Sequence, residues 1–208
     1  MITLHHLNQS RSKRIIWLLE ELGVDYRIQA YQRDATTSLA PDSLKAIHPL
    51  GKSPVIDDDG VVVAESGAIV EYLIGKYDNG RLSPARGSAE HTEYLQWLHF
   101  AESSAILPLL LQLFLKRDGC ETNMLTDYAN NEATKILVFF NDAIADKSYL
   151  VGGTLSGADI MMSFIVDIVE LAQMLDKFPN LSAYRDQLRS HPGCQKAEEL
   201  EREHDTSS

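Results

Sequence analysis

The sequence predicts a two-domain fold, with an α/β domain followed by an all-helical one. Up to Tyr77 the pattern alternates between short strands and helices, whereas from Glu90 onward only the helical period of apolar side chains appears. The segment between them is rich in glycine and proline and has few apolar residues. A chain of 208 residues can form two small domains. We therefore expect one domain at 1–80, a linker at 81–88 and a second domain at 89–208.

In the first domain, the pattern reads strand, helix, strand and then strand, strand, helix. A strand–helix–strand order implies a parallel pair with a right-handed crossover. The turn Asp57-Asp58-Asp59-Gly60 favours a hairpin between the later strands. This βαβ-ββα order is the thioredoxin-like arrangement, with one mixed sheet. The expected elements are strands at 2–7, 24–31, 54–57 and 61–64 and helices at 10–23 and 66–77.

The second domain is predicted to be an all-α bundle. Its first helix runs from Glu90 to Lys116 with a kink at Pro108, because proline removes a helical hydrogen bond. The apolar run from Ile106 to Leu115 is about half as long as the ~20 residues of a membrane span, so we interpret it as core. Further helices are expected at 126–145, 158–175, 180–190 and 192–203.

Composition argues against several classes of function. The net charge of −11 disfavours a nucleic-acid partner, whose phosphates the average surface would repel. Cys120 and Cys194 lie far apart and have no metal-ligand or dithiol spacing, so we expect no metal site and a reducing, cytoplasmic compartment. The first residues carry no signal-peptide pattern, and we expect no membrane partner.

Two short motifs predict a binding site for a peptide-like ligand. In Lys52-Ser53-Pro54-Val55, a cis Ser53–Pro54 bond would turn the main-chain N–H and C=O of Ser53 outward, where an extended ligand could pair with them. Glu65 and Ser66 begin a helix, and unpaired N–H groups there favour a carboxylate. The Glu65 side chain can bind an ammonium group. One end of the ligand is therefore expected to be zwitterionic.

Together with three further segments, these motifs resemble the cytosolic glutathione S-transferase family, in its bacterial and fungal serine-type members, over nearly the whole chain. Singly each segment is weak evidence, but their order and spacing are specific. The matching segments are the helix 10–24, the S-x-x-D box at Thr154–Ile160 and the late run from Phe178 to Pro192.

The resemblance implies the glutathione transferase fold and a glutathione site made by Lys52, Ser53, Pro54, Glu65 and Ser66. Serine at position 53 departs from the family, where an apolar residue tends to precede the proline. Glutathione would be a co-substrate, and no cofactor is expected. The resemblance also implies a homodimer and a small hydrophobic electrophile, whose site we expect to be formed by Leu7, Asn8, Leu107 and Leu111.

Ser10 is the candidate catalytic residue, because it follows the first strand at or just before the first helical turn. Its hydroxyl can donate to a thiolate held at the helix N-terminus. Lowering a thiol pKa by two units needs roughly 2.7 kcal/mol, comparable to one hydrogen bond to a charged group. Ser10 also lies four residues before Arg14, a spacing seen in serine-type members. Ser12 and Asn8 are alternative donors, and Ser10 could instead only cap the helix.

The expected activity is therefore glutathione conjugation, in which bound glutathione attacks a hydrophobic electrophile as a thiolate. Two alternatives stay open: a glutathione-dependent peroxide or disulfide reductase, and a noncatalytic carrier or scaffold of the same fold. Ser156 and Asp159 are expected to be structural. They would form a capping box at the start of a buried helix. Losing the Asp159 side chain should cost stability more than turnover, on the order of 1 kcal/mol or somewhat more if the side chain is buried.

Overall fold

The computed structural model describes residues 1–34, 36–119 and 122–205, so Cys120 lies outside the described residues. The chain divides into two compact units. The first unit combines Met1–Arg81 with Arg189–Ser208, and the second is Leu82–Leu188. By this division the last residues of the chain, from Arg189, group with the first unit, and the domain bounds 1–80 and 89–208 stay a prediction.

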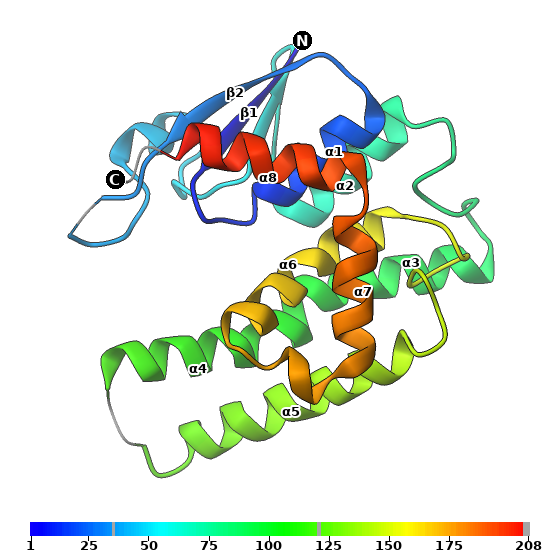
Figure 1. The fold of residues 1–208 in the computed structure, drawn as a ribbon. Coiled ribbons are helices and arrows are strands. Elements are labelled where there is room, and N and C mark those ends of the chain that lie inside the picture. The colour runs from blue at the N-terminus through cyan, green and yellow to red at the C-terminus, as the bar shows by residue number, and fades with distance from the viewer. Residues whose placement is uncertain (35, 120–121, 206–208) are drawn as a thin grey trace. The chain divides into compact units, whose positions relative to one another are not determined.

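The first unit contains a four-stranded sheet in the order β2-β1-β3-β4 (Figure 1). β1 pairs in parallel with β2, and β3 is antiparallel to both β1 and β4. This is the mixed, thioredoxin-like sheet that the strand and helix order predicts. The strands are β1 (Ile2–Leu7), β2 (Tyr26–Tyr31), β3 (Val55–Asp58) and β4 (Val61–Ala64).

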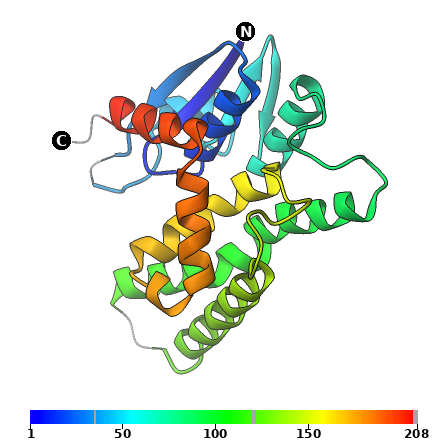
Figure 2. The ribbon, with the colours of Figure 1, turned by 45° about the vertical axis from the view of Figure 1, so that its right-hand side comes forward.

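The described residues of this unit also form the α-helices α1 (Lys13–Leu22), α2 (Ser66–Tyr77) and α8 (Pro192–His204). The stripe of apolar side chains on α1, which includes Ile15 and Leu19, is fully buried. Helix α8 packs along α1, and Figures 1 and 2 both show these two helices side by side. The helical period of α8 predicts a buried face, but it does not identify the element that covers this face.

The second unit is all-helical, as expected (Figure 2). Its long first helix contains a π-helical segment, Ala101–Ala105, shortly before Pro108, and α4 continues through this proline. Pro108 cannot donate to the carbonyl four residues earlier, and the wider helical turn before it accommodates that loss. The α-helices are α3 (Ala89–Phe100), α4 (Ile106–Asp118), α5 (Leu125–Ala143), α6 (Gly157–Leu171) and α7 (Pro179–Arg189).

Within the described residues, the continuous stretch Ala89–Asp118 is the one helix long and apolar enough to cross a membrane by length and composition. One face of it carries core residues of the second unit, among them Tyr94, Trp97 and Leu109. Core helices of soluble proteins pass the same test. The packing of Trp97 against Phe140, with ring centroids 5.8 Å apart, assigns this face to the bundle core.

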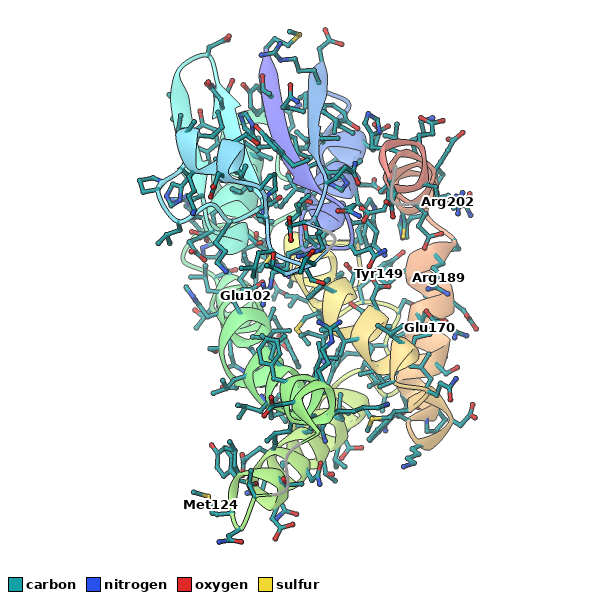
Figure 3. The ribbon with its side chains drawn as sticks, turned by 90° about the vertical axis from the view of Figure 1, so that its left-hand side faces the viewer. Glu102, Met124, Tyr149, Glu170, Arg189 and Arg202 are labelled. Atoms are coloured by element: carbon teal, nitrogen blue, oxygen red, sulfur yellow. The ribbon has the colours of Figure 1, made fainter. Side chains whose placement is uncertain are left out.

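Asp159 organises the start of α6, and the capping box predicted for Ser156 and Asp159 is present. The Asp159 carboxylate accepts from the N–H of Leu150 and the N–H of Ser156, each at 2.9 Å, and from the Tyr184 hydroxyl at 2.7 Å. Farther along α6, Glu170, labelled in Figure 3, accepts from the Arg185 guanidinium on α7 at 2.9 Å.

Candidate functional site

The strand register brings the two predicted binding motifs to one edge of the sheet. Val55 pairs with Ala64, so the residues just before β3 lie beside the residues just after β4. Val55 also pairs with His5, which places the C-terminal end of β1 at the same edge. Ser53-Pro54, Glu65-Ser66 and the loop that follows β1 therefore meet at one edge of the sheet.

Ser53 extends the sheet with its side chain and leaves its main chain unpaired. The Ser53–Pro54 peptide bond is cis. The Ser53 hydroxyl donates to the C=O of His5 at 2.8 Å and accepts from the N–H of Leu7 at 3.1 Å. It thereby continues the β1 ladder past the last main-chain pair. In the described part of the chain, nothing hydrogen-bonds to the main-chain N–H or C=O of Ser53.

Gly51 lies just before this segment, in a backbone conformation that favours glycine. Its φ is +56°, and its N–H donates to the C=O of His48 at 2.8 Å. A Cβ atom at this position would lie 2.8 Å from Cγ of Lys45, so a larger residue would be both strained and crowded. Lys52 follows, exposed, and its ammonium makes no hydrogen bond or ion pair with any described residue.

Glu65 adopts φ +70° and ψ +122°, which is unusual for a residue other than glycine. Backbone outliers of this kind cluster at ligand sites, where the surrounding fold holds them in place. The first helical hydrogen bond of α2 runs from the Ile69 N–H to the C=O of Glu65 at 2.9 Å. The N–H groups of Ser66 and of the two residues after it therefore have no acceptor within the helix. The Glu65 carboxylate and Ser66 hydroxyl have no partner among the described residues.

Ser10 lies outside the first helix, which begins later than expected. Ser12 occupies the N-cap position and Lys13 is the first helical residue. Ser10 is therefore not the N-cap residue of α1, although it lies just before the helix. The Ser10 hydroxyl lies 2.8 Å from the Ser12 hydroxyl and accepts from the Ser12 N–H at 3.2 Å. Ser10 is half-buried, whereas Ser12 is fully buried.

Asn8 is held within the fold. Its side-chain N–H donates to Asp205 at 3.0 Å, and its Oδ1 accepts from the N–H of Arg33 at 3.3 Å. Asn8 is only 2% exposed. Its amide therefore holds the β1–α1 loop against the end of α8, which disfavours the alternative in which it donates to a thiolate. The N–H of Gln9, in the same loop, donates to Glu201 of α8 at 2.8 Å.

His6 is a polar residue of this site that the sequence analysis does not select. It is fully buried, and its Nδ1 lies 2.7 Å from the Ser12 hydroxyl. Its Nε2 lies 3.5 Å from Glu201 Oε2. Burial, assisted by the nearby His204, lowers the pKa of His6 to about 4, so the imidazole is neutral at pH 7. Two adjacent histidines in a predicted strand do not indicate that one of them contacts a helix N-cap, so the sequence pattern could not identify His6.

Comparisons with known proteins agree with this architecture. The N-terminal domain of glutathione S-transferases matches residues 1–75, and a C-terminal domain of the same family matches residues 107–197. The chain is 31% identical to glutathione S-transferase 3 of Schizosaccharomyces pombe, over 96% of this chain and 87% of that protein. It is 33% identical to glutathione S-transferase 1 of Saccharomyces cerevisiae, over 79% of each chain.

Solved structures give the same result for the fold. A glutathione S-transferase from Actinobacillus pleuropneumoniae superposes with a TM-score of 0.90 at 36% identity, covering 97% of this chain and 93% of that one. A glutathione transferase homologue from Lodderomyces elongisporus, solved with two glutathione molecules per subunit, gives a TM-score of 0.82 at 25% identity, covering 96% and 98%. The resemblance and the fold class predicted from the sequence are confirmed: the chain belongs to the cytosolic glutathione S-transferase family.

Proposed function

We propose that this chain is a glutathione transferase that binds glutathione at the edge formed by the start of β3, the end of β4 and the β1–α1 loop. The observation that carries the proposal is a set of unpaired polar groups at this edge. The main chain of Ser53, the side chains of Glu65 and Ser66, and the exposed Lys52 make no hydrogen bond within the described residues, although they belong to a well-packed unit.

Each of these groups fits one part of glutathione. The Ser53 N–H and C=O pair with the extended peptide backbone of the ligand, as an added strand would. Ser66 and the first N–H groups of α2 bind the α-carboxylate of the γ-glutamyl end, while Glu65 binds its ammonium. Lys52 binds the glycine carboxylate. Pro54 orients the segment without taking part in hydrogen bonding.

Ser10 lies at the same edge and is the residue to which we assign thiolate stabilisation. A hydrogen bond to a charged group contributes about 1.5–3 kcal/mol. This corresponds to about one to two pKa units for the bound thiol, at 1.36 kcal/mol per unit. Ser12 is fully buried and its hydroxyl contacts the Ser10 hydroxyl, so we expect Ser12 to act on the thiol only by way of Ser10.

Family membership supports three further parts of this proposal, which concern the second substrate, the oligomeric state and the cellular compartment. We propose a small hydrophobic electrophile that is attacked by the thiolate, a homodimer, and a cytoplasmic location. In the first unit, Leu7 is buried at 4% exposure, and in the second unit Leu107 is exposed at 54%. The electrophile site formed by these residues, Asn8 and Leu111 stays a prediction.

The direct test is a pH titration of thiolate ultraviolet absorbance for glutathione bound to excess protein, with S-methylglutathione as the blank. We expect the bound thiol to titrate one to two units below free glutathione, and Ser10→Ala to remove most of this shift. Ser43→Ala, which changes an exposed serine on the 3-10 helix Asp42–Ala46, is the matched control. An unchanged thiol titration in the wild-type protein would refute the transferase mechanism.

Binding and activation are separated by a second pair of variants. Lys52→Ala and Glu65→Gln remove a charge that we assign to a terminal group of glutathione, so each should weaken binding about tenfold or more. Neither should alter the pKa of the thiol once glutathione is saturating. Isothermal titration calorimetry measures the affinity, and a variant that binds as tightly as wild type would remove that residue from the site.

A further inference from the structure

Arg33 begins the loop after β2, next to the loop that carries Ser10. Tyr31 ends β2 and pairs with Leu7, which ends β1. Because β1 and β2 are parallel, the loops that follow them leave the sheet at the same edge. A side chain at the start of one loop therefore lies within reach of the main chain of the other.

The Arg33 guanidinium donates to the two carbonyls that precede Ser10. Its Nε donates to the C=O of Asn8 at 3.1 Å, and its Nη2 donates to the C=O of Gln9 at 3.0 Å. The main-chain N–H of Arg33 also donates to Oδ1 of Asn8 at 3.3 Å. A planar guanidinium presents its donors in a fixed fork, so bonds to two successive carbonyls restrict both their positions and their directions.

These bonds bear on the orientation of Ser10. The C=O of Gln9 and the N–H of Ser10 belong to one planar peptide group, so a bond that holds this carbonyl also holds the N–Cα bond of Ser10. Only φ and χ1 of Ser10 then set the direction of its hydroxyl. The hydroxyl accepts from the Ser12 N–H at 3.2 Å and lies 2.8 Å from the Ser12 hydroxyl. Arg33 thus supports the main chain of the residue to which we assign thiolate stabilisation.

Gln9 has a backbone conformation that depends on such support. Its φ is +51°, which is uncommon for a residue other than glycine. A residue of this kind persists only where its neighbours hold it in place. The N–H of Gln9 donates to Glu201 at 2.8 Å, and its C=O accepts from Arg33, so the residue is held on both sides.

The third donor of the guanidinium connects it to its own loop. Nη1 of Arg33 donates to the C=O of Ser38 at 3.0 Å. Ser38 lies in a turn built on Asp34, whose C=O accepts from the Ser38 N–H at 2.8 Å. Oδ1 of Asp34 accepts from the N–H of Thr36 at 3.1 Å and from the N–H and hydroxyl of Thr37 at 2.7 and 2.9 Å. This turn gives the guanidinium a fixed point outside the Ser10 loop.

We propose that Arg33 is a positioning residue for the transferase reaction, which holds the Gln9–Ser10 peptide so that the Ser10 hydroxyl stays directed at the thiol of bound glutathione. This inference rests on the proposed function, because it requires a thiol at Ser10. Arg33 also has interactions beyond these hydrogen bonds, so replacing it lowers stability as well. The experiment has to separate this loss from an effect on Ser10.

A double-mutant cycle on the thiol pKa of bound glutathione makes this separation. Arg33→Gln alone should raise the thiol pKa by about half a unit or more, because the hydroxyl of Ser10 is no longer held toward the sulfur. In a Ser10→Ala background, Arg33→Gln should leave the thiol pKa unchanged, because no hydroxyl remains to be directed. A loss of stability alone would not depend on the Ser10 hydroxyl.

Two further variants separate hydrogen bonding from charge. Arg33→Lys keeps the positive charge, but an ammonium lacks the planar fork, so we expect it to raise the thiol pKa as Arg33→Gln does. Arg202→Gln, at an exposed position on α8, removes the same charge and is the matched control. Isothermal titration calorimetry with S-methylglutathione should give affinities within about twofold of wild type in all of them, because the proposed ligand groups on β3 and α2 are unchanged.

The Gln9–Ser10 peptide itself is observable without any ligand. It is the only Gln–Ser pair in the sequence, so carbon-13 labelling of glutamine carbonyls and nitrogen-15 labelling of serine amides give one NMR signal from this peptide. We expect this signal to move or to split in Arg33→Gln and to stay in place in Arg202→Gln. An unmoved signal in a folded Arg33→Gln protein would overturn the inference, because the guanidinium then does not hold this peptide.

The outcomes distinguish this inference from the function on which it rests. A lowered thiol pKa in the wild-type protein that Arg33→Gln leaves unchanged would overturn the role of Arg33 and leave the transferase proposal intact. So would full rescue by Arg33→Lys, or an equal rise with and without the Ser10 hydroxyl. A wild-type thiol that titrates as free glutathione does would overturn both. A rise that requires the Ser10 hydroxyl would support the positioning role.

Discussion

Replacing Asp159 by asparagine should destabilise the second unit far more than the loss of a helix cap. Oδ1 accepts from the Leu150 N–H at 2.9 Å and the Tyr184 hydroxyl at 2.7 Å, and Oδ2 accepts from the N–H and hydroxyl of Ser156 at 2.9 and 2.8 Å. An asparagine keeps one accepting oxygen and turns an NH₂ group toward two donors. Asp159 is fully buried, so water cannot replace the lost partners.

The magnitude follows from these contacts. Each hydrogen bond to a charged group contributes about 1.5–3 kcal/mol, so losing two predicts a cost of about 3–6 kcal/mol for Asp159→Asn. A simple cap contributes about 1 kcal/mol, which is the value expected from the sequence pattern, with somewhat more for a buried carboxylate. Asp159→Ala removes both oxygens and all four hydrogen bonds, so it should cost about 6 kcal/mol or more, a large fraction of the total stability of a typical domain.

Urea unfolding followed by tryptophan fluorescence measures these costs by linear extrapolation. Tyr184→Phe removes a single donor and should cost about 1–2 kcal/mol. Asp142→Asn, at an exposed position on α5, should be neutral and is the matched control. If Asp159→Asn unfolds within about 1 kcal/mol of wild type, the reasoning from four converging donors is wrong.

Three further predictions concern the first unit. Ser53→Val should lower the free energy of unfolding by about 1–2 kcal/mol, because it leaves the N–H of Leu7 without its acceptor. The KM for glutathione should stay within about twofold of the wild-type value, because the main chain of residue 53 can still pair with the ligand. Between pH 6.5 and 4, protonation of His6 should destabilise the protein by up to about 3 kcal/mol, because the unfolded chain protonates His6 more readily than the folded chain does. In pH-dependent urea titrations, His6→Gln should reduce this slope and leave the smaller contribution of His5, whose pKa burial also lowers, while His99→Gln should retain the full slope. Asp58→Asn should lower the free energy of unfolding by about 2–3 kcal/mol at pH 7, because this fully buried carboxylate accepts from one ammonium and two tyrosine hydroxyls. A urea unfolding midpoint equal to that of the wild-type protein would contradict this role.

Local patterns predicted the parts of the fold that depend on neighbouring residues. The apolar spacing in α1 and the turn at Asp57–Gly60 led to the correct order of strands and helices. The Lys52–Val55 and Glu65–Ser66 motifs were correctly expected to begin a strand and a helix. The hairpin register then brings the two motifs to one edge, because strands that pair at Val55 and Ala64 leave their flanking residues side by side.

Contacts between distant segments could not be predicted in this way. Glu201 and Asp205 reach the β1–α1 loop from the opposite end of the sequence, and no local period encodes which surface α8 covers. The start of α1 was also placed too early, because Ser10 and Ser12 are equally good N-cap residues by composition. The choice depends on the buried contact between Ser12 and His6, which requires the tertiary fold.

The position of α8 has a consequence for biosynthesis. Because Arg189–Ser208 complete the unit that Met1–Arg81 begin, a ribosome must make all of Leu82–Leu188 before the first unit can close. At about 5–20 residues per second, this interval lasts roughly 5–20 seconds. Throughout it, the nascent chain displays a sheet whose Ser10 loop lacks Glu201 and Asp205. A product released before α8 is made would therefore carry the two sheet-edge motifs, but its Ser10 loop would lack the contacts with Glu201 and Asp205.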